Sequence, residues 1–369
     1  MNHPNVLIIH HQGGGGMIHF LDQWKQNHHG QIYELYSDMK GLFFLIPDRD
    51  PRRITYPQLA GLIQQYEINE LHIHHLWNIQ ISKLLNVIKR SGVSHRIWLH
   101  DFFSVCPFVF FVDQKGNYCG MPKEDPICDA CASFGAKRIQ MKHMLCESAP
   151  TIRSWRDQFR QLLSTAESIT APSESTKLIM ESYEPSLCID VIPHTLQLEY
   201  EPQKKVAIAS LPIRIAVLGH IYAHKGVREL ASLIMQSENA KLSCEFYLYG
   251  EAGRDLTKLT QSNFIKRSAY SSPDRLFSLL HEDHIDLVLI PSICPETFSY
   301  TTHEALLLGY PVICFDLGAQ AEVVKERNAG WTVPANDPHG LYDMINELIN
   351  NPEQIEQVKR TLYQGRSNE

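Results

Sequence analysis

The sequence predicts an α/β protein built from two domains. Short apolar runs alternate along the chain with amphipathic stretches, a pattern typical of parallel strands covered by helices. The alternation lapses over residues 197–212, a polar, proline-flanked stretch, and then resumes. The length of 369 residues also suits two domains of about 150 residues each. We therefore expect an N-terminal domain over residues 1–195 and a C-terminal domain over residues 213–369.

The composition indicates a globular protein and excludes several other classes. Hydrophobic residues make up 44% and charged residues 20% of the chain, which is enough apolar surface to form real cores. The net charge of −7 gives no general attraction to nucleic acid. No apolar stretch reaches the ~20 residues that span a membrane, and the N-terminus has the pattern of a strand rather than a signal peptide. We therefore expect a cytoplasmic protein with reduced cysteines that does not bind nucleic acid.

The N-terminal domain begins with an apolar run at residues 5–10, typical of a strand buried on both faces. Four glycines follow, and a helix is expected from about Met17. Further strands are expected at residues 31–36, 41–46, 71–76, 96–100, 168–171 and 189–193. Further helices are expected at residues 56–66, 79–89, 152–165 and 174–182. Residues 102–135 follow neither period, so we predict a long irregular insertion, a kind of loop that is usually functional or separately stabilised.

The C-terminal domain repeats the alternation. Its strands are expected at residues 214–219, 246–249, 285–291, 311–315 and 330–333. Its helices are expected at residues 225–235, 273–281, 301–308, 319–326 and 338–349. Two domains of this kind imply two sheets facing across a cleft, and ligands of open parallel sheets bind at the carboxyl ends of the strands. The cleft is therefore the expected binding site.

Two glutamates, Glu296 and Glu304, lie where a predicted strand passes through a loop into a helix that starts near Ser299. The amides of a helix start are unpaired donors beside the positive end of the helix dipole, which suits phosphate. Glu296 can accept hydrogen bonds from sugar hydroxyls, and Glu304 can bind a vicinal diol such as ribose. Taken alone, two glutamates at this spacing indicate a solvated helix face. The strand that follows Gly309-Tyr310-Pro311 makes the functional interpretation more specific.

At these residues the sequence resembles glycosyltransferase family 4, the retaining nucleotide-sugar transferases of GT-B fold. The family motif is two glutamates separated by seven residues, which Glu296 and Glu304 match. The resemblance covers residues 214–352 and includes the segment 318–324. In the first half it rests on shorter matches, which are the glycine loop, Leu99-His100-Asp101 and residues 191–194. It implies the GT-B fold, with two Rossmann-like domains facing across a cleft.

A second match to the family is the segment from Gly219 to Gly226, where a strand enters a helix. Lys225 is placed at the helix start, where an ammonium can neutralise a leaving diphosphate. Family members usually have an arginine where this chain has His220, and both basic residues grip the donor diphosphate. His220 fills that role only when protonated, unless Arg267 or another group replaces it. The alternative is that Lys225 is an ordinary exposed lysine.

The glycine loop at residues 13–16 separates a predicted strand from a helix, where glycine lets the backbone approach a ligand closely. Its spacing is not G-x-G-x-x-G, so a nicotinamide dinucleotide is not expected. In the resembled family this loop faces the acceptor and the donor phosphate; a merely tight turn is the alternative. The donor site that the resemblance implies here consists of Gly14, Gly15, Gly219, His220, Lys225, Thr297, Phe298, Ser299, Tyr300 and Glu304.

Histidines are concentrated in the N-terminal domain. His100 ends a predicted strand, and family members often have a histidine at this point that contacts the transferred sugar; a structural role is the alternative. In a second cluster, strand alternation places His72 and His74 on one face and His75 on the other. We favour a structural or acceptor-lining role for His74 and His75 over metal binding.

Four cysteines fall in the predicted insertion, and they are Cys106, Cys119, Cys128 and Cys131. The last two form a C-x-x-C pair, and four thiolates can close a tetrahedral zinc site. A long loop without a core of its own needs something to order it, so a structural zinc is one interpretation. Ordinary reduced thiols are the other, and a redox pair is the least favoured.

Two charged features have plain alternatives. Asp48-Arg49-Asp50 matches the Asp-x-Asp motif of the other major glycosyltransferase fold, but its surroundings favour a polar turn. Basic residues crowd the region after the insertion, at Lys137, Arg138, Lys142, Arg153, Arg156 and Arg160. We favour a solvated face for them over contact with anionic lipid at the inner face of the membrane.

The resemblance implies a retaining glycosyltransferase of hexosyltransferase type in cell-surface polysaccharide biosynthesis. It would move a sugar from a nucleoside-diphosphate sugar to a glycan or lipid-linked acceptor. Glu296 would orient the sugar, Glu304 would hold the ribose, and His100 would contact the sugar. No essential divalent metal is expected, because Lys225 and the helix dipole neutralise the diphosphate. The alternatives are a GT-B sugar-nucleotide epimerase or phosphorylase, and a non-catalytic module that binds nucleotide sugars.

Overall fold

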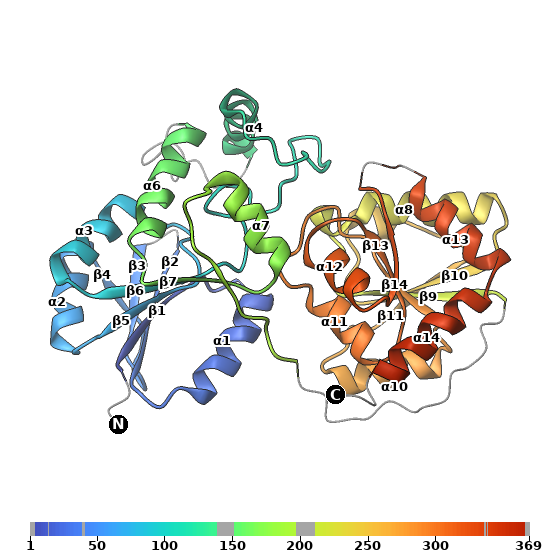
Figure 1. Cartoon of the computed structure of the whole chain (residues 1–369), viewed down its shortest axis with the longest axis horizontal. Helices are drawn as coiled ribbons and strands as arrows, with labels where there is room; N and C mark the ends of the chain where they lie inside the picture. The colour runs from blue at the N-terminus through green and yellow to red at the C-terminus, as the bar shows by residue number, and fades with distance from the viewer. Residues whose placement is uncertain are drawn as a thin grey trace. The chain divides into compact units, whose positions relative to one another are not determined.

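The computed structural model describes residues 4–13, 15–38, 41–138, 151–196, 211–335, 337 and 339–365. The chain divides into two compact units (Figure 1). Unit 1 consists of Met1–Gln114 and Cys119–His194, and unit 2 consists of Lys115–Tyr118 and Thr195–Glu369. Each unit contains a β-sheet with helices packed around it, which confirms the predicted α/β class. Across the described ranges, no helix is both long and apolar enough to span a membrane.

The described part of unit 1 contains an eight-stranded sheet in the order β4-β3-β2-β1-β5-β6-β7-β8. Its strands are β1 (Val6–Ile9), β2 (Ile32–Asp38), β3 (Gly41–Leu45), β4 (Arg52–Ile54), β5 (Glu70–Ile73), β6 (Ser94–Trp98), β7 (Ser168–Ala171) and β8 (Asp190–Val191). The fully buried β1 pairs in parallel with β2 and β5. The strand order therefore reverses between β1 and β5, and ligands of such sheets bind beyond the carboxyl ends of strands at this point.

One edge of this sheet differs from the prediction of parallel sheets. β3 pairs antiparallel with β2, and β4 pairs antiparallel with β3. Only two residues separate the end of β2 at Asp38 from the start of β3 at Gly41. A parallel pair needs a crossover of about a dozen residues or more, so this connection imposes an antiparallel pair.

The helices of unit 1 match the predicted positions except in the insertion. They are α1 (Gly16–Asn27), α2 (Tyr56–Gln65), α3 (Ile81–Ser91), α4 (Asp125–Arg138), α6 (Ile152–Ser164) and α7 (Glu174–Tyr183). Thr55 and Gln58 form a capping box that fixes the start of α2. The predicted irregular insertion over residues 102–135 is wrong in its last part, which forms α4. The apolar residues of α4 do not line one face, so the sequence shows no helical period there.

The described part of unit 2 contains a six-stranded parallel sheet in the order β11-β10-β9-β12-β13-β14. Its strands are β9 (Ile213–Leu218), β10 (Cys244–Tyr249), β11 (Phe264–Arg267), β12 (Leu287–Ile290), β13 (Val312–Phe315) and β14 (Gly330–Val333). Its helical segments are the 3₁₀ turn Ala223–Lys225, α8 (Val227–Asn239), α9 (Arg254–Thr257), α10 (Pro273–Glu282), α11 (Tyr300–Leu307), α12 (Gly318–Glu326), α13 (Gly340–Asn350) and α14 (Glu353–Gly365). The strand order reverses between β9 and β12.

The last helix, α14, is joined to the sheet of unit 2 by a buried ion pair. Lys359 Nζ lies 3.6 Å from Asp286 Oδ1, and the two side chains are 7% and 9% exposed. Asp286 Oδ2 also accepts the backbone N–H of Arg214 at 3.0 Å. Burial lowers the pKa of Lys359 and raises that of Asp286, although each charge partly offsets the shift of the other. Leu362 of the same helix joins the apolar core of the unit.

Candidate functional site

The reversal point of the unit 2 sheet brings two predicted segments together. β9 and β12 pair directly in parallel, so the loops that follow them leave the same edge of the sheet. Gly219 and His220 follow β9, and Lys225 ends the 3₁₀ turn in the same connection. The loop after β12 carries Glu296 and runs into α11.

Lys225 and Glu296 form an ion pair at this edge. Lys225 Nζ lies 2.8 Å from Glu296 Oε1, and the hydroxyl of Ser292 donates to the same oxygen. Burial would raise the pKa of Glu296, but the Lys225 ammonium and two serine hydroxyls lower it below its ordinary value. Burial likewise opposes the charge on Lys225, yet Glu296 holds its pKa above the ordinary value. Both groups are therefore charged at neutral pH.

Gln320 fixes the loop that carries Glu296, and sequence reasoning did not single it out. Its side chain is fully buried. Its Oε1 accepts the backbone N–H of Glu296 at 3.0 Å, and its Nε2 donates to the carbonyl of Cys294 at 2.9 Å. One amide therefore satisfies both a donor and an acceptor of the loop, which holds the backbone of Glu296 in place.

The start of α11 is built on a strained residue. Ser299 precedes the helix with φ 64° and ψ 73°, in the left-handed region that a serine rarely adopts. Its hydroxyl lies 2.7 Å from the Thr302 hydroxyl, and its side chain does not cap the helix. Such outliers cluster at functional sites. The turn directs the positive end of the helix dipole to the predicted donor segment Thr297, Phe298, Ser299 and Tyr300.

Glu304 lies on α11 and is bound by a residue that the sequence did not indicate. The hydroxyl of Tyr270 donates to Glu304 Oε2 at 2.7 Å. Burial raises the pKa of Glu304, and the hydrogen bond from Tyr270 opposes that rise. The structure therefore shows a partly buried carboxylate whose partner is a phenol rather than a cation.

His220 and Arg267, the residues considered for the second cationic role, are engaged elsewhere. His220 Nδ1 lies 3.3 Å from Glu251 Oε2, and both side chains are well exposed. Arg267 Nε donates to Asp283 Oδ2 at 2.8 Å, and its guanidinium lies over the ring of Tyr247. The ion-pair partners of these two side chains are therefore Glu251 and Asp283, and the partner of Lys225 is Glu296.

In unit 1, histidines gather at the reversal point between β1 and β5. His74 follows β5 and His100 follows β6, and His74 Nδ1 lies 2.8 Å from His100 Nε2. The ring of His74 also stacks on Trp98. Burial lowers the pKa of His100 to about 3 and that of His74 well below its ordinary value. Both imidazoles are therefore neutral at pH 7, and one of the two rings donates its N–H to the unprotonated nitrogen of the other.

His75 has different neighbours from His72 and His74: its ring stacks on Phe103, whereas both of the other rings lie against Trp98. His75 Nδ1 accepts the backbone N–H of Trp77 at 2.9 Å, so its Nε2 carries the proton and donates to Asp101 Oδ2 at 3.1 Å. Both ring nitrogens are used, which fits the structural role considered for this residue. Of the glycine loop, Gly15 precedes α1 with φ 112°, a conformation that requires glycine. The predicted contact at Gly14 lies outside the described residues.

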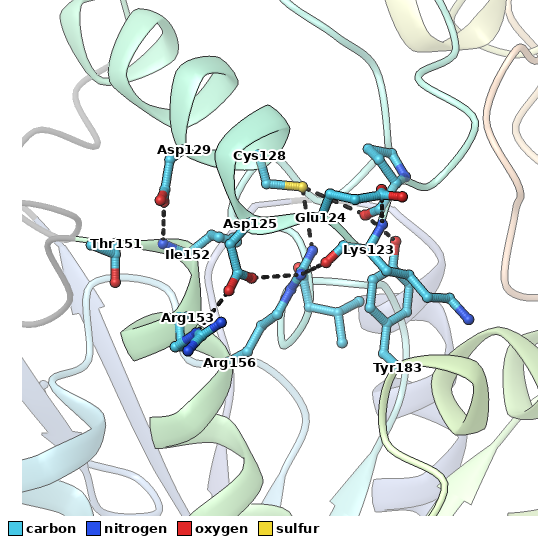
Figure 2. Close-up of polar contacts among 12 residues, drawn as sticks. Lys123, Glu124, Asp125, Cys128, Asp129, Thr151, Ile152, Arg153, Arg156 and Tyr183 are labelled. Carbon is cyan, nitrogen blue, oxygen red and sulfur yellow. Dashed lines mark hydrogen bonds and ion pairs between the residues drawn. The ribbon is translucent and has the colours of Figure 1, made fainter.

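The cysteine insertion is held by Arg156 of α6, as Figure 2 shows. Its guanidinium donates to the carbonyl of Val105 at 3.1 Å, to the carbonyl of Lys123 at 3.2 Å and to Cys128 Sγ at 3.4 Å. It also lies over the ring of Tyr183. Three separate segments of the chain thus meet at one side chain.

Asp125, at the start of α4, forms ion pairs with two arginines of α6. Arg153 Nε donates to Asp125 Oδ2 at 2.7 Å, and Arg156 Nη1 lies 3.6 Å from Asp125 Oδ1 (Figure 2). Arg160 pairs with Asp157 and Glu184. These arginines are therefore engaged within unit 1 and are not a purely solvated face. Lys142 and the side chains of Lys137 and Arg138 lie outside the described part of the chain.

The four thiols of the predicted zinc site lie near one another, since Cys106 interacts electrostatically with Cys119 and Cys131, and both of these interact with Cys128. Burial raises the pKa of Cys106 to about 12 and that of Cys119 to about 11, and burial also raises the pKa of Cys128 and of Cys131. Among the residues with described positions, no group of three or more His, Cys, Asp or Glu is arranged to hold a metal ion. Zinc therefore stays a prediction, and metal analysis of protein purified without chelator tests it.

Replacing Arg156 with alanine removes its hydrogen bonds to the insertion, which is therefore expected to unfold locally more often. Each hydrogen bond from a charged donor contributes about 1.5–3 kcal/mol, so local opening and cleavage by chymotrypsin at residues 106–123 should become at least about tenfold faster. Arg153→Ala is the matched control, because the Arg153 side chain is 77% exposed. Limited proteolysis followed by mass spectrometry gives the rates. Equal cleavage of both variants would show that Arg156 does not order this segment.

The chain was compared with known families and structures. Residues 212–351 match the family described as "Glycosyl transferases group 1". Sucrose-phosphate synthase from Thermosynechococcus elongatus is similar in structure, with a TM-score of 0.65 and 13% identity over 98% of this chain and 93% of that one. Anabaena Alr3699/HepE in complex with UDP-glucose is also similar, with a TM-score of 0.63 and 14% identity over 99% of this chain and 95% of that one. A glycosyltransferase from Rickettsia africae has a TM-score of 0.59 and 14% identity over 99% of this chain and 94% of that one. No curated protein sequence matches.

These comparisons define the class of fold. The chain has the GT-B fold, as the sequence predicted, and its similarity to the solved structures extends over nearly its whole length. The sequence match to the glycosyltransferase group lies within unit 2 and includes the Lys225–Glu296 pair and Glu304.

Proposed function

We propose that the protein is a retaining glycosyltransferase that moves a sugar from a nucleoside-diphosphate sugar to a glycan or lipid-linked acceptor in the synthesis of a cell-surface polysaccharide. The observation that carries the proposal is the partly buried ion pair at the reversal point of the unit 2 sheet, between Lys225 of the 3₁₀ turn and Glu296 of the loop that leads into α11. Two findings support it: the family match of residues 212–351, and a similar structure that contains UDP-glucose.

Unit 2 is proposed to bind the donor. Lys225 and the amides of residues 297–300 would stabilise the diphosphate as the bond between its terminal phosphate oxygen and the anomeric carbon breaks. The acceptor hydroxyl would attack that carbon from the face that the diphosphate leaves, and its proton would pass to the departing phosphate oxygen. This course retains configuration without a protein nucleophile. Glu296 would orient the sugar, and Glu304 would hold the ribose.

Unit 1 is proposed to present the acceptor. His100 is neutral because burial holds its pKa near 3, so its contact with the transferred sugar would be a neutral hydrogen bond and not an ion pair. Gly15 leaves α1 without a side chain at its start, which would let a donor phosphate or the acceptor approach the backbone. Because Lys225 supplies positive charge to the diphosphate, turnover is expected to persist when divalent metal is chelated.

A panel of UDP-, GDP-, ADP-, CDP- and dTDP-sugars, incubated with candidate acceptors, tests the proposal through release of nucleoside diphosphate and analysis of the sugar product. Transfer from one donor supports it. Release of an epimer or a sugar phosphate would favour the epimerase or phosphorylase. Binding without turnover would favour a non-catalytic module, which His220 in the place of the usual arginine already suggests as the second candidate.

A further inference from the structure

The contact between Tyr270 and Glu304 connects two parts of unit 2 that are distant in sequence. Tyr270 lies in the connection between β11 and α10, and Glu304 lies on α11. The phenol donates to Glu304 Oε2 at 2.7 Å. The ring of Tyr270 packs against the apolar core of the unit, so packing fixes the position of its hydroxyl.

Glu304 needs such a donor because of its surroundings. Burial favours the neutral acid, and within the described structure the titratable side chains that interact with it are Tyr270 and, one turn earlier on the same helix, Tyr300. Neither is a cation. Burial also raises the pKa of Tyr270, so the phenol stays protonated and donates throughout the physiological range.

The ionised form of Glu304 is the form that suits a vicinal diol. A carboxylate accepts hydrogen bonds at both oxygens, with about four lone-pair positions in all. Tyr270 occupies one of them, on Oε2. The remaining positions can accept both hydroxyls of a ribose, whereas the protonated acid loses acceptor capacity and presents a hydrogen instead. A ligand that lacks one hydroxyl leaves part of this buried group unsatisfied, which is the physical basis of strong discrimination.

We propose that Tyr270 is a positioning residue that holds Glu304 ionised and oriented, and that it thereby sets a preference for nucleotides with an intact ribose diol over 2′-deoxynucleotides. The inference rests on the proposed function, because it assigns Glu304 to the ribose of a nucleotide donor.

Isothermal titration with UDP, GDP and ADP, and with the 2′-deoxy form of the tightest binder, tests this inference in the full-length protein. Wild type is expected to prefer the ribonucleotide. Tyr270→Phe removes only the hydroxyl and is expected to weaken ribonucleotide binding about tenfold or more. It should weaken binding of the deoxy form less, because that ligand has only the 3′-hydroxyl to offer Glu304. Tyr247→Phe is the matched control, since its hydroxyl bonds Glu245 at 2.8 Å on β10.

The pH dependence separates positioning from a general structural defect. The hydrogen bond from Tyr270 lowers the pKa of Glu304, so its removal raises that pKa further. Binding that requires the ionised carboxylate is lost as pH falls through this pKa. The loss is therefore expected at higher pH in Tyr270→Phe than in wild type. Glu304→Gln, which has no ionisable group here, is expected to lack the preference at every pH, and adding Tyr270→Phe to it should cause no further loss.

Two outcomes overturn the inference, and they are distinguishable. If Tyr270→Phe keeps both the ribose preference and the wild-type pH profile, the role assigned to Tyr270 is wrong while the proposed function stands. If wild type binds none of the three nucleotides or their sugar donors, the proposed function fails and the inference falls with it.

Discussion

Lys225→Ala is expected to lower kcat/KM for the nucleotide-sugar donor by about 10²–10³-fold, the loss typical of removing one charge-stabilising group from a reacting centre. Lys225 is held at the reversal point of the sheet by Glu296, and its pKa is raised there. Under the proposed function it is therefore a cation when the diphosphate departs. Alanine removes this charge and also leaves Glu296 buried without its partner. Steady-state kinetics with the donor identified by the panel measure the effect.

Glu296→Gln is expected to cause a loss of the same order by a different route. Glutamine keeps the shape of the side chain but removes the charge that holds Lys225. Because the two residues act as one unit, the double variant should lose much less than the product of the single effects. Lys258→Ala, at an exposed lysine of the same unit, is the control and should behave as wild type. Full turnover in Lys225→Ala would contradict the assignment of this site.

Lys359→Ala is expected to destabilise unit 2 by roughly 3–5 kcal/mol, because removing one partner of a buried ion pair leaves an uncompensated charge. Asp286 would remain buried under α14 with the N–H of Arg214 as its hydrogen-bond donor. Denaturant unfolding followed by tryptophan fluorescence or circular dichroism gives the change. Lys325→Ala breaks an ion pair whose side chains are about half exposed, and it is expected to cost about 1 kcal/mol or less.

The pH dependence of the Lys359→Ala defect has a definite sign. Burial raises the pKa of Asp286 in the folded protein, so the folded state favours the protonated acid once the lysine is absent. The destabilisation should therefore be complete at high pH and should shrink as pH falls through the folded pKa. The double variant Lys359→Met/Asp286→Asn keeps an acceptor for Arg214 and should recover most of the stability. A defect equal at all pH values would show that lost packing, not lost pairing, is its cause.

Most of the fold could be predicted because its strands are buried. β1, β12 and β13 are continuous apolar runs that are completely buried, and their sequences differ clearly from the amphipathic helices between them. β11 was not predicted, since it is a partly exposed edge strand that ends in Lys266 and Arg267. α4 was not predicted because its apolar residues do not recur at the spacing of a helix. The helix packs against α6, a contact that the sequence does not reveal.

The candidate site could be predicted only where its residues are close in sequence. The spacing of Glu296 and Glu304 across a strand–loop–helix unit is visible in the chain, as is Lys225 at a helix start. Tyr270 lies 34 positions from Glu304 and Gln320 lies 24 positions from Glu296, so folding alone brings these partners together. Arg267 was considered from the sequence as a second cation for the diphosphate. In the folded protein it binds Asp283 instead, a pairing that the sequence did not indicate.

Unit 2 is proposed to activate a nucleotide sugar and to transfer the sugar with retention of configuration. Proton NMR of donor turnover tests this proposal most directly, with water as a surrogate acceptor when no glycan is supplied. The expected result is that wild type consumes one α-linked nucleotide sugar, that the α-anomer of the free sugar appears before mutarotation, and that Lys225→Ala is nearly inactive. Release of the β-anomer first, or binding of the donor without its consumption, would contradict the account.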